Sequence, residues 1–181
     1  PFAYDNELPK HMLQLETYNI SRQPVSNAEY LAFMEEGGYT NTSHWSADAW
    51  QWLQQHQLCH PEHWRQNKNN DWYGLKDQGA FELNDNAPVY GINHYEASAF
   101  AHWANARLPH EHEWEACAKL ERIENTGKVW EWCANTFQPY KDFKAFPGDK
   151  TEPCFDDKHY VLKGATHFTR PEIKRASFRN Y

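Results

Sequence analysis

Histidines and cysteines are the residues of this 181-residue chain that could bind a metal ion or supply a nucleophile. His110 and His112 stand two positions apart at the start of a predicted helix, where side chains point in different directions and suit a single ion poorly. We expect His110 to be a makeshift cap of that helix or a surface residue instead. A second set is spaced four and three residues apart with a proline inside it: His56, His60 and His63. We expect these to be loop histidines, so no metal site is predicted in the chain itself.

The four cysteines are scattered along the chain: Cys59, Cys117, Cys133 and Cys154. None of them forms a CxxC pair, which excludes a zinc ribbon and a thioredoxin-type redox motif. The N-terminus has no charged region followed by an apolar region, so no secretory signal is visible. Buried free thiols in a reducing compartment, and hence a cytoplasmic protein, are therefore expected.

The composition argues against three other classes of protein. Aromatic residues make up 16% of the chain, which is more than disordered chains contain. The mean hydropathy is -0.98, and no apolar run approaches the length of about 18 residues that a membrane span needs. The net charge of -7 has the opposite sign to that of most nucleic-acid binders. We expect a folded protein that binds neither membranes nor nucleic acid.

Four short helices are predicted from capping residues and apolar spacing. Ser26 and Glu29 form a capping box before the first helix, and Gly37-Gly38 ends it because glycine adopts the left-handed conformation without a Cβ penalty. Ser46 can cap the second helix, and Asn93 caps the third. The four helices are expected over residues 27–36, 47–55, 94–104 and 111–120.

Strands are fewer and weaker in the pattern. Apolar alternation with one slip predicts a strand over residues 11–20, and further strands are expected over 89–92, 159–164 and 176–179. Residues 59–93 otherwise read as a long irregular stretch rich in Asn, Gly, Asp and Trp. The predicted fold is an irregular α+β domain with short helices, few strands and long loops, spanning residues 1–181.

Four segments, taken in order, resemble motifs of the formylglycine-generating-enzyme (sulfatase-modifying factor) fold. They are residues 24–30 (PVSNAEY), residues 106–109 (ARLP) with 113–115 (EWE), residues 127–132 (GKVWEW) and residues 161–166 (VLKGAT). Each motif alone is weak, but their order and their spread over most of the chain are specific. The resemblance implies that irregular fold, which is related to C-type lectin folds.

Three flanking segments narrow the resemblance to the C-terminal domain of ergothioneine-type sulfoxide synthases. They are residues 2–7 (FAYDNE), 36–39 (EGGY) and 177–181 (SFRNY). Those enzymes use iron(II) and oxygen to join the sulfur of a cysteine-type thiol to the imidazole of Nα-trimethylhistidine, or hercynine. Selenoneine synthases and ovothiol-pathway enzymes are relatives on the same scaffold. A non-enzymatic binding module of this fold remains an alternative.

Two departures from these families shape the expected function. Formylglycine-generating enzymes carry a reactive cysteine pair shortly after the "RGGS" segment, whereas residues 167–175 here contain no cysteine, which disfavours that oxidase activity. In the synthases, three histidines of an N-terminal helical domain hold the iron. The resemblance therefore places the Fe(II) ligands outside this chain, on a missing partner domain. The resemblance also leads us to expect that the segment which closes the fold after the FRN motif lies outside residues 1–181.

The resemblance assigns the substrate site to Arg179, Asn180 and Tyr181, because the Asn and the aromatic residue at these positions line the hercynine pocket in the synthases. An Asn side chain can hold a carboxylate or an imidazole nitrogen. A ring face attracts a trimethylammonium group by about 0.5–2 kcal/mol. The alternative interpretation is that Arg179 and Asn180 simply end a core strand.

Two further roles known from the resemblance find weak support in this sequence. Some synthases place a proton-donating tyrosine before the "VLRGG" strand, but residues 148–154 contain none, which leaves Tyr140 and Tyr160 on either side. Related folds bind calcium near the position of Glu131. In this motif, residues 127–132, Lys128 replaces the family's usual Asn. A cation at that position argues against a calcium site, so we expect Glu131 to be structural.

Overall fold

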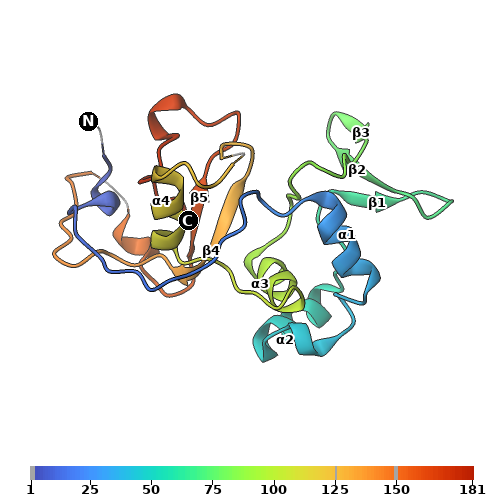
Figure 1. Cartoon of the computed structure of the whole chain (residues 1–181). Helices are drawn as coiled ribbons and strands as arrows, with labels where there is room; N and C mark the ends of the chain where they lie inside the picture. The colour runs from blue at the N-terminus through green and yellow to red at the C-terminus, as the bar shows by residue number, and fades with distance from the viewer. Residues whose placement is uncertain (1–2, 125, 149–150) are drawn as a thin grey trace. The chain divides into compact units, whose positions relative to one another are not determined.

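The computed structural model describes residues 3–124, 126–148 and 151–181 (Figure 1). The chain forms two compact units, the first made of Pro1–Gln23 with Leu108–Tyr181 and the second of Pro24–Arg107. Short helices, short antiparallel strands and long loops make up both, which confirms the predicted α+β class. Each helix in the described part of the chain is too short or too polar to cross a membrane. The prediction that residues 1–181 form one domain is not tested by this division into two units.

The helices of the second unit begin where the capping residues predict. Ser26 caps α1 (Asn27–Glu35) through a reciprocal box with Glu29, and Ser46 caps α2 (Ala47–His56). Asn93 and Glu96 form a second box before α3 (His94–Trp103). Gly37 has a φ of +85°, and the amide of the next residue donates to the carbonyl of Phe33 at 2.9 Å, which closes the end of α1.

The core of the second unit consists of aromatic rings around a buried polar chain. Tyr30 and Phe33 of α1 are fully buried and pack edge to face. The Tyr30 and Tyr39 hydroxyls lie 3.0 Å apart, and Tyr39 donates to Glu96 at 2.5 Å. Burial raises the pKa of the Glu96 carboxyl, which these hydrogen bonds partly offset. Glu96 therefore caps α3 and also joins it to the core.

The prediction that residues 59–93 are irregular is wrong in part, because they contain a three-stranded antiparallel sheet. Its strands are β1 (Trp64–Gln66), β2 (Trp72–Lys76) and β3 (Gly79–Phe81), in the order β1-β2-β3. The Asn67 side chain accepts from the amides of Asn69 and Asp71 at 2.8 and 3.0 Å. The Asn-rich stretch is thus a tight turn between strands of only three to five residues.

The first unit contains α4 (Glu111–Lys119) and a two-stranded antiparallel sheet of β4 (Trp130–Thr136) and β5 (Tyr160–Gly164), as Figure 1 shows. Short 3-10 turns occur at Asp5–Glu7, Glu152–Cys154 and Pro171–Ile173. Cys133, Phe137 and Val161 are completely buried beside this sheet. The predicted strand at 159–164 is confirmed, whereas β4 was recognised only as an aromatic cluster.

Three predicted strands are absent from the described residues. Residues 11–20 are extended, but their backbone pairs with none of the described segments. Beside the segments 89–92 and 176–179 there are only isolated bridges. Pro88, just before the first segment, pairs with Ser26, and Asn180, just after the second, pairs with Leu162. Apolar alternation predicted extended backbone correctly there, but pairing depends on partners distant in sequence.

Candidate functional site

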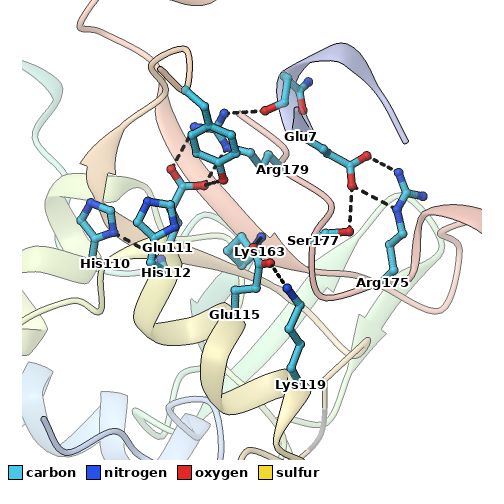
Figure 2. A network of polar contacts seen from close by, with 12 residues as sticks. Glu7, His110, Glu111, His112, Glu115, Lys119, Lys163, Arg175, Ser177 and Arg179 are labelled. Carbon is cyan, nitrogen blue, oxygen red and sulfur yellow. Dashed lines mark hydrogen bonds and ion pairs between the residues drawn. The ribbon is translucent and has the colours of Figure 1, made fainter. Parts of the chain in front are cut away.

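Arg179 lies at the centre of the most buried polar network in the first unit. Its side chain is 1% exposed, and its guanidinium donates to both carboxylate oxygens of Glu111, at 2.7 and 2.9 Å. Two further bonds go to the carbonyls of Asn6 and Gln138, at 2.7 and 2.9 Å. Figure 2 shows Arg179 reaching Glu111 at the start of α4. The charge of Arg179 is therefore fully paired.

Glu111 is placed by the start of α4. It is the first residue of that helix, and its amide donates to Asn135 of β4 at 2.9 Å while its carboxylate accepts from the Asn135 amide group at 3.0 Å. A carboxylate at a helix N-terminus is also favoured by the helix dipole. Glu111 thus connects α4, β4 and the C-terminal segment.

Aromatic rings lie against the Arg179 guanidinium. Its central carbon lies 4.7 Å from the Phe137 ring centre and 4.1 Å from that of Tyr140. The Tyr140 hydroxyl donates to Glu111 at 3.3 Å. Burial and the Glu111 charge raise the pKa of Tyr140 well above its ordinary value. Tyr140, a candidate proton donor from the sequence, is in this structure a partner of the buried ion pair.

Asn180 follows Arg179 and pairs with β5. Its amide donates to the Leu162 carbonyl at 3.1 Å, and the Leu162 amide donates back at 2.9 Å. Within the described residues, the Asn180 side chain makes no hydrogen bond, and the residue is partly exposed. The backbone of Asn180 is thus fixed by its pairing with Leu162 of β5.

Tyr181 packs on the same core through one ring face. Its ring stacks on Phe137 with centres 4.2 Å apart and planes 22° from parallel, and His159 meets it edge-on at 5.8 Å. The residue is 38% exposed. Partial burial, followed by a hydrogen bond with Cys154, raises the pKa of the phenol. Arg179 and Tyr181 therefore both contact Phe137, and Asn180 lies between them in the sequence with its side chain partly exposed.

A second buried carboxylate belongs to Glu7, the residue that follows Asn6. Glu7 is 9% exposed and forms a two-point ion pair with Arg175, one bond of which measures 3.1 Å. Ser177 also donates to it at 2.8 Å. Figure 2 shows Glu7 bound to Arg175 and Ser177, one residue after Asn6, whose carbonyl accepts from Arg179. The sequence analysis missed the pair, because its partners are 168 residues apart.

Lys163 of β5 is a fully buried cation. Its ammonium lies 3.2 Å from the Glu115 carboxylate of α4, which also binds Lys119 at 2.5 Å. Burial lowers the pKa of Lys163, opposed by its acidic neighbours. The pKa of Glu115 is raised by burial but lowered more strongly by the two lysines, with a net downward shift. The pair ties the helix to the sheet.

Histidines gather at the start of α4 without forming a metal site. The His110 ring accepts from the His112 amide at 3.2 Å, so the predicted cap is confirmed. The His112 ring lies 4.7 Å from that of His110 and 5.7 Å from that of His11, and burial lowers its pKa. Among the described residues, no group of three His, Cys, Asp or Glu side chains could hold a metal ion.

The cysteines and Glu131 complete the titratable groups of interest. None of the four cysteines forms a disulfide. The prediction of buried thiols is confirmed for Cys117 and Cys133, holds only in part for the half-buried Cys154, and is wrong for the exposed Cys59. Its neighbours Leu58 and Pro61 pack inward while the Cys59 side chain faces solvent. Burial raises the pKa of the Cys133 thiol far above its ordinary value, which makes it a poor nucleophile. Burial also raises the pKa of Glu131 to about 7.

Part of the predicted proton-donor loop lies outside the described residues. That loop, 148–154, includes residues 149 and 150, which the structure does not describe. Tyr160, the other flanking tyrosine, begins β5 opposite Thr136. Its position is that of a strand residue.

Comparison with known proteins identifies the family. The model of the sulfatase-modifying factor enzyme 1-like domain (FGE-sulfatase) matches residues 2–125. The chain belongs to this family. The short helices, short strands and long loops of the structure agree with its irregular fold.

Several curated members of the wider group are similar to the whole chain. The "Hercynine oxygenase" of Mycobacterium tuberculosis is 31% identical over all of this chain and 52% of its own length, and that of Mycolicibacterium thermoresistibile is 28% identical over 100% and 51%. The "Ergothioneine biosynthesis protein 1" of Schizosaccharomyces pombe is 25% identical over 99% of this chain and 26% of its own. The chain thus spans about half, or less, of the length of these relatives.

Proposed function

We propose that this chain is the substrate-binding part of an iron(II)- and oxygen-dependent sulfoxide synthase. The reaction joins a cysteine-type thiol to the imidazole of hercynine in ergothioneine biosynthesis, in the cytoplasm. Support comes from the two hercynine oxygenases that align with the complete chain and from the family of the domain. Selenoneine and ovothiol synthases use the same scaffold and differ in the donor atom or substrate.

The observation that carries the proposal is the partly exposed ring of Tyr181 stacked on Phe137. One face of this ring is occupied by Phe137, so the opposite face is the one that a ligand can reach. A trimethylammonium group cannot donate a hydrogen bond, and an aromatic face stabilises it by cation–π attraction. Tyr181 is therefore proposed to bind the betaine end of hercynine.

Asn180 supplies the polar contact in this proposal. Its backbone is fixed by two hydrogen bonds to Leu162, which limits the entropy lost when its side chain binds a ligand. The carboxamide can donate to a carboxylate or to an imidazole nitrogen. In this proposal Tyr181 contacts the trimethylammonium group, which distinguishes hercynine from histidine, and Asn180 contacts a hydrogen-bonding group that the two compounds share.

Arg179 contributes to the site as a positioning residue. Its guanidinium bonds to Glu111 and two carbonyls, so it holds the segment rather than touching the ligand. The side chains of the described residues do not fit an iron site, because no three His, Cys, Asp or Glu among them are grouped to hold a metal ion. The proposal assigns the iron ligands to a helical domain of the full-length protein.

Calorimetric titration of the chain with hercynine and with histidine tests the proposal. Hercynine is expected to bind more tightly, because only it carries the trimethylammonium group. Equal affinity for the two compounds, or no binding of hercynine, would overturn it.

A further inference from the structure

Three buried side chains in the core of the second unit form a chain of hydrogen bonds. The Tyr39 hydroxyl donates to the Glu96 carboxylate at 2.5 Å, and the Tyr30 hydroxyl lies 3.0 Å from that of Tyr39. Tyr30, Tyr39 and Glu96 are 0%, 7% and 3% exposed, and all three belong to Pro24–Arg107. Because Tyr39 uses its only hydroxyl proton on Glu96, Tyr30 is the donor in the second bond. The chain therefore runs from Tyr30 through Tyr39 to Glu96.

Glu96 is placed to receive a proton from Tyr39. Its second oxygen accepts from the Asn93 amide at 2.9 Å, and it is the third residue of α3, where the helix dipole favours a negative charge. Burial raises the pKa of its carboxyl, so the carboxylate is a stronger base than one in water. A short hydrogen bond to an ionised acceptor also leaves the proton only a small distance to move.

Oxidisable rings lie on both sides of this chain. The Trp45 and Tyr39 ring centres are 5.8 Å apart. On the other side, the Trp64 ring lies 6.3 Å from that of Tyr30 and 5.9 Å from that of Trp72. Tyrosine and tryptophan lose a single electron more readily than most side chains, and ring contacts of this kind let an electron pass in short steps. The core thus joins a series of oxidisable rings to one phenol that has a base beside it.

We propose that Tyr39 is a redox-active residue that gives one electron, through the neighbouring tryptophans, to an oxygen-derived one-electron oxidant. In this step the O–H bond of Tyr39 breaks, an O–H bond forms on Glu96, and the electron reduces the oxidant. The products are a neutral tyrosyl radical and a neutral carboxylic acid. The buried negative charge disappears, which burial favours, and Tyr30 donates to the radical oxygen. This proposal is independent of the hercynine site.

Laser flash photolysis of the chain with tris(bipyridine)ruthenium and a sacrificial electron acceptor tests the proposal, because it produces trivalent ruthenium as the one-electron oxidant. Transient absorption and electron paramagnetic resonance measure the lifetime of the tyrosyl radical. Tyr39→Phe and Glu96→Gln should each shorten the longest lifetime at least about tenfold, through loss of a charge-assisted hydrogen bond. Glutamine also serves in a capping box, so Glu96→Gln retains the start of α3. The matched control is Tyr90→Phe, which removes another phenol of this unit and should stay within about twofold of the parent.

Three results would overturn the proposal. If Tyr39→Phe, folded by circular dichroism, keeps the lifetime within about twofold of the parent, the radical resides on another tyrosine. If Tyr39→Phe shortens the lifetime and Glu96→Gln does not, Glu96 is not the proton acceptor. The parent gives a readout that needs no variant: its long-lived radical should form more slowly in deuterium oxide, because the proton moves with the electron. Equal rates in the two solvents would contradict the coupled step.

Discussion

Glu111 and Arg179, which are 68 positions apart in the chain, form a two-point ion pair with both side chains almost completely buried. The pair fixes the C-terminal segment to the first turn of α4. Because Asn180 and Tyr181 follow directly, their positions depend on it. The buried ion pair and the proposed ligand contacts are therefore adjacent parts of one arrangement.

Breaking this pair should destabilise the protein strongly. Arg179→Ala strands the buried Glu111 carboxylate and should reduce the free energy of unfolding by about 3–5 kcal/mol. The exposed pair of Arg22 and Glu124 offers a matched control, and Arg22→Ala should cost less than about 1 kcal/mol. Urea denaturation monitored by tryptophan fluorescence measures both. Similar losses for the two variants would show that the buried pair contributes no more than a surface pair.

The buried Glu131 carboxyl should make stability depend on pH. Its pKa is raised from 4.5 to about 7 in the folded state, so the folded chain binds a proton that the unfolded chain has already lost. Stability associated with this group is complete below pH 4.5 and falls as the pH rises towards 7, by about 2–3 kcal/mol.

Glu131→Gln removes this titration while keeping the shape. The stability of the variant relative to the parent should increase between pH 4.5 and 7.5 and then level off. Denaturation curves of both proteins across this range provide the measurement, and other titrating groups cancel in the difference. A difference that does not vary with pH would mean that Glu131 is ionised normally in the folded chain.

The cysteines should matter for stability and not for ligand binding. Cys133→Ala removes a completely buried side chain and should cost about 1–3 kcal/mol, whereas Cys59→Ala at an exposed position should cost less than about 0.5 kcal/mol. Chemical denaturation tests the stabilities, and titration of the variants with hercynine tests the binding. If a folded variant with only one cysteine replaced lost hercynine binding, that thiol would have a role in ligand binding.

The chain alone should bind no iron(II) tightly. No suitable group of three ligands exists in the described parts of the chain. His110 caps α4, and the His112 ring packs against the His110 ring. Anaerobic titration with iron(II), followed by equilibrium dialysis, is the measurement. A stoichiometric site of submicromolar affinity would contradict the assignment of the iron ligands to another domain.

Local signals in the sequence were enough to predict all four helices. Ser26, Ser46 and Asn93 each cap the helix that the spacing predicted, because capping depends on residues only three apart. The strands were harder, since the register of β4 against β5 pairs Trp130 with Gly164. Local sequence does not encode that distance, and residues 11–20 alternate like a strand yet pair with none of the described segments.

The candidate site was predictable in its residues but not in its arrangement. The resemblance pointed to Arg179, Asn180 and Tyr181, yet the sequence did not show that Arg179 faces inward towards Glu111. Glu111 itself looked like an ordinary helix-start acid. Buried ion pairs between distant segments leave no local pattern, so only the folded structure separates the positioning residue from the two that a ligand can reach.

The most direct test of the central claim is hercynine calorimetry on the chain with three substitutions. Tyr181→Ala should weaken hercynine binding about two- to thirtyfold through loss of the ring, and Asn180→Ala should weaken it about fivefold or more through loss of a hydrogen bond. Tyr181→Phe keeps the ring and should stay within about twofold of the parent. If both alanine variants, folded by circular dichroism, bind hercynine within twofold of the parent, Asn180 and Tyr181 are only the end of the structure beside β5, and the account is wrong.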